Sequence, residues 1–239
     1  PAPQSFLQWL REQRRDAQQN LAYKNLPAEI KNEIKRALLK GQGHLCAYTQ
    51  CKLLSQSDCH IEHLIPQHQN PAIDLTYDNM LACFPQDGGD TKHGYGAPIK
   101  SGMKVKLGEN FVSPYAPACE QRFKFDQTGR IDSKPDDKGA QQTIECLCLN
   151  HAQLVELRRR ALSAHGLTLR LSDLRSQRYA RLKKTSRPLS AKEAQALVSR
   201  VMQADAQGRL EPFCSAIAQV AASYAQRETE RASRLKNLH

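Results

Sequence analysis

The stretch HIEHLIP at residues 60–66 is the most informative part of this 239-residue sequence, because an acid and a histidine stand side by side in it. On a strand, Glu62 and His63 would point to opposite faces unless a bulge or a turn re-aims one of them. Hydrolysis at a phosphate can use two groups of this kind. The carboxylate can bind a metal ion, and the neutral imidazole can accept a proton from water. The pair therefore predicts acid–base chemistry beside a metal ion.

Two later segments supply polar residues that suit the same site. Asn79 lies sixteen residues after His63 and opens the short apolar run that ends at Cys83. Its side-chain amide can hydrogen-bond a backbone segment and so fix the loop that carries the histidine. His93 follows fourteen residues after Asn79, and we expect it to close the metal site from the start of a helix.

The eight cysteines are too dispersed to indicate a small disulfide-bonded scaffold. The first residues have no continuous apolar stretch typical of a secretion signal, and no apolar run reaches the roughly 18 residues of a membrane helix. We therefore expect a cytoplasmic protein with no membrane partner, whose thiols are reduced and include some metal ligands. The cysteines are Cys46, Cys51, Cys59, Cys83, Cys119, Cys146, Cys148 and Cys214.

Apolar periodicity predicts helices on both sides of a centre that is rich in Cys, His, Asp and Gly and is expected to depend on metal. Phe123 and Phe125 alternate with polar residues before a turn at Thr128 and Gly129, which predicts a hairpin. Asn150 and Ser190 are the predicted N-caps of later helices. The predicted elements are helices over 4–20 and 26–39, a hairpin over 121–131, and helices from 150, over 190–206 and over 211–236.

This pattern divides the chain into three predicted segments and indicates an α+β protein. Residues 1–43 form N-terminal helices, and residues 44–135 form the central core with its flanking hairpin. Residues 136–239 form a basic C-terminal helical region.

The positive charge is concentrated in the second part of the chain. The net charge is +11, and residues 151–239 hold 17 Lys and Arg against 7 Asp and Glu. The charges of residues 1–150 nearly cancel, with 18 basic and 17 acidic side chains. Nucleic acid is the favoured partner of such a surface, and a solvated basic face without a partner is the alternative. Within residues 170–187, seven cations could grip phosphates, form a charged helix face or dock an acidic protein.

The residues Glu62, His63, Asn79 and His93 resemble the motif of the HNH (ββα-metal) nuclease family. Roughly residues 20 to 165 are similar to a narrower branch, the HNH component of Septu-type and retron-associated anti-phage systems, which acts beside an ABC/SMC-like ATPase. The similarity rests on Cys46-Ala-Tyr, Ile61 to Pro66, Asp78-Asn79-Met-Leu, Phe123 to Ile131, Thr143 to Asn150 and Leu154 to Arg158.

The resemblance implies a small ββα-metal core and a role for each matched residue. His63 would be the general base and Asn79 the loop anchor. Glu62 and His93, with Asp90 as a second acidic candidate, would lie at a Mg²⁺ or Mn²⁺ site. The resemblance also implies a structural zinc site that includes Cys46, Cys51 and Cys83, although Gln86 stands where zinc-stapled relatives have a fourth cysteine.

The implied function is a metal-dependent endonuclease that acts in an anti-phage complex. DNA is the default substrate, and tRNA or other RNA is the alternative, because the chemistry does not choose between the sugars. The implied partners are the ATPase and, in a retron, the reverse transcriptase and its DNA. The rival hypothesis is a non-catalytic, zinc-containing adaptor that binds nucleic acid, in which His63 and the cysteines are structural.

Overall fold

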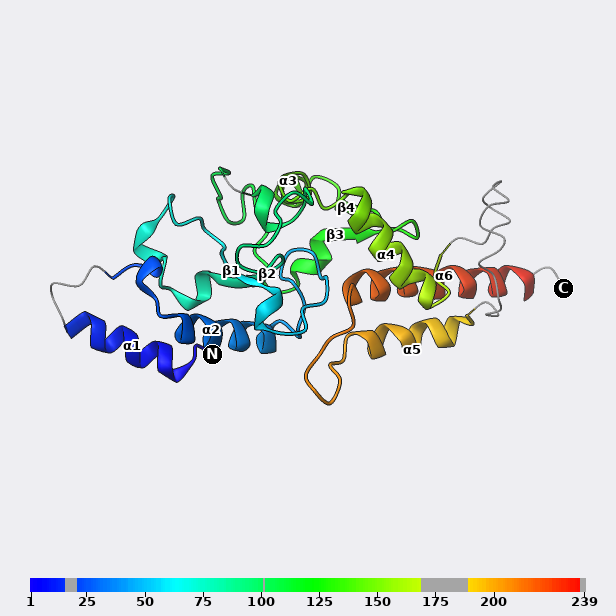
Figure 1. The fold of residues 1–239 in the computed structure, drawn as a ribbon. Coiled ribbons are helices and arrows are strands. Elements are labelled where there is room, and N and C mark those ends of the chain that lie inside the picture. The colour runs from blue at the N-terminus through cyan, green and yellow to red at the C-terminus, as the bar shows by residue number, and fades with distance from the viewer. Residues whose placement is uncertain (16–20, 101, 169–188, 237–239) are drawn as a thin grey trace.

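The computed structural model describes residues 1–15, 21–100, 102–168 and 189–236. Its elements are α1 (Gln4–Arg15), α2 (Ala28–Gly41), β1 (His60–His63), β2 (Met80–Cys83), β3 (Phe123–Phe125), β4 (Ile131–Ser133), α3 (Lys138–Cys146), α4 (Ala152–Ala164), α5 (Ala191–Val201) and α6 (Cys214–Lys236). Over these ranges the protein is a mixed α+β structure with six α-helices and two small two-stranded antiparallel sheets. Figure 1 shows α1 and α2 at one end of the molecule and α5 and α6 at the other.

The first sheet pairs β1 with β2, from His60 opposite Cys83 to His63 opposite Met80. Burial alternates along β1, and β2 is buried over its whole length. Glu62 and His63 therefore belong to opposite faces of the strand, as strand geometry requires. Helix α2 packs against both strands and fixes the sheet on the N-terminal part of the molecule.

The N-terminal helices occur close to where the periodicity predicts them, although α2 begins and ends two residues later than the predicted range 26–39. Helix α1 ends at Arg15, and the rest of its predicted range, 16–20, lies outside the described residues. Helix α2 follows Pro27 and buries Ile34 and Leu38 in the core. Proline suits this position because the backbone N–H that it lacks would have no partner inside the helix.

The second sheet is the predicted hairpin, and a glycine lets it contact helix α4 closely. The Asp126 carboxylate accepts the backbone N–H of Thr128 and tightens the turn. Gly129 has φ +87°, and a Cβ atom there would lie 2.4 Å from the carbonyl oxygen of Val155 in α4. A side chain at this position is therefore excluded both by the backbone conformation and by the neighbouring helix.

The prediction that Asn150 caps helix α4 is wrong by one residue. His151 is the N-cap, and its Nδ1 atom accepts the backbone N–H of Gln153. Asn150 instead bonds both backbone groups of Ile131 in β4, at 2.9 and 2.8 Å. Its amide is used in a tertiary contact, which local capping rules do not anticipate.

The buried apolar side chains form two clusters. The first joins α1, α2, both sheets, α3 and the start of α4, and the second joins α4, α5 and α6 with Leu45. Ser190 caps α5 as predicted, in a reciprocal capping box with Glu193. The boundaries at residues 43 and 135 stay predictions, and the basic segment 170–187 lies outside the described residues. None of the described helices is long and apolar enough to span a membrane.

Candidate active site

A cleft of about 460 Å³ lies at the end of β1. It brings Glu62 and His63 together with Tyr23 from the N-terminal part of the chain and Lys100 from the loop after β2. Its walls are formed by Tyr23, Ile61, Glu62, His63, Pro66, Gln67, His68, Ala97, Lys100 and Gly102.

The His63 ring is held in one orientation and one tautomer. Its Nε2 atom lies 2.8 Å from the carbonyl oxygen of Asp74, and the edge of Tyr23 packs on the ring with centroids 4.7 Å apart. A carbonyl oxygen can only accept, so Nε2 carries the proton and Nδ1 keeps its lone pair. Burial lowers the pKa of His63 below its usual value. The ring is therefore a neutral imidazole at pH 7, with Nδ1 as its basic atom.

Asn79 fixes the loop that follows His63. Its side chain accepts the backbone N–H of Ile65 at 2.8 Å and donates to the carbonyl of the same residue at 3.1 Å. Its own carbonyl accepts the N–H of Leu64 at 2.8 Å. Because Asn79 is buried, these bonds tie the start of β2 to the residues just after His63.

Glu62 is surrounded by two basic side chains. Its Oε1 atom lies 2.5 Å from the ammonium of Lys100, and its Oε2 atom lies 3.5 Å from Nε2 of His60. Burial alone would raise the pKa of Glu62, but His60 and Lys100 outweigh burial and lower it. Glu62 is therefore a carboxylate at neutral pH.

Lys100 is only 2% exposed and is the one described cation that contacts both members of the Glu62–His63 pair. Besides Glu62, its ammonium donates to the carbonyl oxygen of His63 at 2.5 Å and to the Tyr48 hydroxyl at 3.1 Å. Sequence reasoning missed this residue, since no spacing rule connects it to β1. The sequence also led us to expect His60 to be a loop histidine near the substrate at most. It lies on β1 instead, and its i, i+2 relation to Glu62 was available as a signal.

His93 and Asp90 lie together in a turn, so the helix expected to begin at His93 is not there. His93 Nδ1 contacts the backbone carbonyl of Asp90 at 2.9 Å, and its ring packs between Phe84 and Tyr95. Its Nε2 atom is buried without a hydrogen-bond partner. Glycines and short turns fill the segment after β2, which explains why no helix forms there.

The predicted zinc ligands are brought only partly together. The Cys83 thiol donates to Cys46, and this bond, opposed by burial, helps to lower the pKa of Cys46 to about 6. Burial raises the pKa of Cys51 to about 11, and the Cys59 thiol points to the carbonyl of Gln56. Across the described ranges, no three or more His, Cys, Asp or Glu side chains gather in a way that would hold a metal ion.

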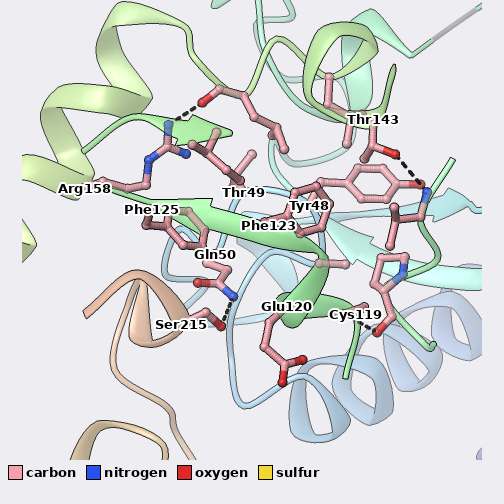
Figure 2. Close-up of a pocket in the computed structure, with 16 residues that line it drawn as sticks. Tyr48, Thr49, Gln50, Cys119, Glu120, Phe123, Phe125, Thr143, Arg158 and Ser215 are labelled. Atoms are coloured by element: carbon pink, nitrogen blue, oxygen red, sulfur yellow. Dashed lines mark hydrogen bonds between the residues drawn. The ribbon is translucent and has the colours of Figure 1, made fainter. Parts of the chain in front are cut away.

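A second cavity, of about 90 Å³, is lined by residues of the first hydrophobic cluster together with polar side chains, and it carries no such chemistry. Figure 2 shows Arg158 at one end of it and Thr143 and Tyr48 at the other. Arg158 is buried and donates to the carbonyl oxygens of Gly129 and Leu149, and Thr143 accepts the N–H of Val112. Gln50 and Cys119 in this lining also bond to the protein itself, so we regard this cavity as structural.

The fold and the cleft define a small α+β protein in which a neutral histidine and a carboxylate share one opening. No family model matches the chain. Over 135 residues the chain is 28% identical to a candidate HNH endonuclease of retron Vc95 from Vibrio cholerae serotype O1 biovar El Tor. The match covers 52% of this chain and 62% of that relative. The comparison therefore shows distant homology to this retron protein.

Proposed function

We propose that this chain is a metal-dependent HNH endonuclease that hydrolyses phosphodiester bonds in nucleic acid, with β1 and β2 as the strands of its core and turns where the ββα-metal core would have its helix. The observation that carries the proposal is the tautomer of His63. The contact of Nε2 with the Asp74 carbonyl leaves a basic Nδ1 on a histidine that lines the cleft. A general base must be neutral and held in one orientation, and burial and this bond provide both.

The chain's own residues can then be given roles in the reaction. Nδ1 of His63 takes the proton from a water molecule, whose oxygen attacks phosphorus as the leaving oxygen departs. Asn79 holds the loop beside the base, and Lys100 orients Glu62 and the backbone of His63. Pre-positioned groups of this kind lower the barrier because they need no rearrangement during reaction.

The donor set at Glu62 fits a divalent ion such as Mg²⁺ or Mn²⁺. Glu62 is ionised, and proteins commonly hold Mg²⁺ by one or two carboxylates together with substrate phosphates. When bound, such an ion would neutralise the phosphate and stabilise the leaving oxygen.

We further propose a role in a prokaryotic anti-phage complex with an ABC/SMC-like ATPase, in which a retron reverse transcriptase and its DNA take part. The support is the retron origin of the relative and the resemblance over residues 20–165. The excess of 17 basic over 7 acidic side chains in residues 151–239 suits a polyanionic substrate, with DNA first and tRNA as its alternative.

Cleavage of plasmid DNA and bulk tRNA, assayed side by side, tests this function. The wild-type chain, His63→Ala and the control His165→Ala would each be incubated with Mn²⁺ or with EDTA, with and without the neighbouring ATPase. His165 is a suitable control because it pairs with Glu211 near the second cluster, away from the cleft.

We expect cleavage that needs both the metal and His63, and the substrate that is cut decides between DNA and RNA. Loss of His165 should leave the rate unchanged. No cleavage of either substrate, together with tight binding of nucleic acid, would favour the non-catalytic adaptor.

A further inference from the structure

Two neighbouring side chains on one face of β1 point at each other across a gap. His60 and Glu62 are two residues apart on the strand, so both project from the same face. Their facing atoms, Nε2 and Oε2, are 3.5 Å apart, which is longer than an ordinary N–H···O bond. The other His–Glu pair of the described structure, His165 with Glu211, is in direct contact at 2.5 Å.

The other ring nitrogen of His60 is already in use. Nδ1 lies 2.6 Å from the carbonyl oxygen of Pro85, which can only accept, so Nδ1 carries the proton. In a neutral ring, Nε2 then presents a lone pair toward Glu62. Burial lowers the pKa of His60, but Glu62 and the Pro85 carbonyl outweigh burial and raise it, so a metal ion competes with a proton for this atom. Histidines that bind metals usually donate their second N–H to a carbonyl or carboxylate in this way, because the bond fixes both tautomer and ring orientation.

One of the two carboxylate oxygens of Glu62 is likewise already bonded. Lys100 occupies Oε1, so Oε2 is the oxygen left to face His60. Carboxylate and imidazole ligands bind transition metals at about 2.0–2.2 Å, and twice this distance exceeds 3.5 Å. One ion can therefore contact both atoms without moving the strand.

We propose that His60 and Glu62 are the protein's ligand pair for the divalent ion, with the remaining positions left to water and substrate phosphate. This rests on the proposed function and replaces His93 with His60 as the histidine ligand. Like His60, His93 contacts a backbone carbonyl through Nδ1, and its buried Nε2 has no hydrogen-bond partner. Its ring is packed between Phe84 and Tyr95, however, and across the described ranges it does not join His60 and Glu62 in a group that could hold a metal ion. The rival interpretation is a simple ion pair between a protonated His60 and Glu62.

Binding of Mn²⁺ to the full chain without nucleic acid tests the pair. Electron paramagnetic resonance measures free Mn²⁺ for the wild type, His60→Gln, Glu62→Gln, His93→Gln and the matched control His165→Gln. We expect a loss of affinity of about tenfold or more for the first two variants and wild-type affinity for the last two. Wild-type affinity in His60→Gln would overturn the proposal, and so would a wild type that binds no Mn²⁺.

A second measurement on the wild type keeps the test independent of variant folding. Electron spin echo envelope modulation of bound Mn²⁺ reports a directly coordinated imidazole nitrogen, and ¹⁵N-labelled histidine must change the signal. Absence of nitrogen modulation would overturn the proposal. If the wild type binds Mn²⁺ through nitrogen but cuts neither DNA nor tRNA, the proposed function fails while this ligand assignment stands.

Discussion

The two hairpins of the described structure, β1–β2 and β3–β4, use the same polar contacts, yet only the first of them builds a candidate active site. Beside β1 and β2, Asn79 bonds both backbone groups of Ile65, and beside β3 and β4, Asn150 does the same for Ile131. Each hairpin also has a buried cation on backbone carbonyls, Lys100 in the first region.

Arg158 is the corresponding cation in the second region, where it donates to the carbonyls of Gly129 and Leu149. The difference lies in what accompanies these contacts. Lys100 also binds a carboxylate, Glu62, beside a histidine and an opening of about 460 Å³. Buried amides and cations are thus ordinary means of fixing loops, and a functional site needs titratable partners and access in addition.

The largest stability effect is expected when the buried cations are removed. Lys100→Met leaves the mostly buried Glu62 without its closest cation, which should cost about 3–5 kcal/mol. Arg158→Met leaves two carbonyls unpaired, which should cost about 2–4 kcal/mol. Urea denaturation measures both values, and Mn²⁺ affinity should change only in Lys100→Met, because only Lys100 contacts the proposed ligand Glu62. An equal change of Mn²⁺ affinity in both variants would mean that the two regions do not differ in metal binding.

Asn79 and Asn150 allow a closer comparison of the two regions, because each bonds both backbone groups of one isoleucine. Asn79→Ala and Asn150→Ala each remove a paired backbone contact and should each lower stability by about 1–3 kcal/mol. Per folded molecule, only Asn79→Ala should slow cleavage, because Asn79 fixes the loop beside the base. Thermal unfolding and single-turnover rates separate these effects. An unchanged rate in Asn79→Ala would mean that its role is purely structural.

The smallest effect is expected for the thiols of Cys46 and Cys83, of which Cys83 ends β2. Because the Cys83 thiol donates to Cys46, changing both to alanine should be non-additive by about 0.5–1 kcal/mol. Cys214 is buried in the second hydrophobic cluster, so Cys214→Ala should add independently to Cys83→Ala. Urea titration of the two double-mutant cycles measures this, and full additivity at Cys46 and Cys83 would argue against their contact.

Much of the fold follows from local patterns in the sequence. The apolar stripes of α1 and α2, the alternation before Gly129 and the Ser190 cap predict elements that the structure contains. Each of these signals depends on neighbours within a few residues. They work because backbone geometry alone determines which positions share a face.

The remaining features depend on contacts that leave no local pattern. The orientation of His63 comes from the backbone carbonyl of Asp74, and that of His60 from the carbonyl of Pro85. Every residue type has a carbonyl, so no residue type marks these positions. Lys100 reaches β1 from 37 residues beyond His63, and only the tertiary structure brings its ammonium to Glu62.

Chemical rescue of His63→Ala by imidazole tests most directly the central claim, that His63 is the general base. Removing the ring opens space at the wall of the cleft, and added imidazole can enter it and accept the proton from water. We expect the variant to lose about 10²–10⁴-fold in single-turnover rate and to recover part of that loss as imidazole rises. Asn79→Ala should show no recovery. A His63→Ala variant that cleaves at the wild-type rate would contradict the account.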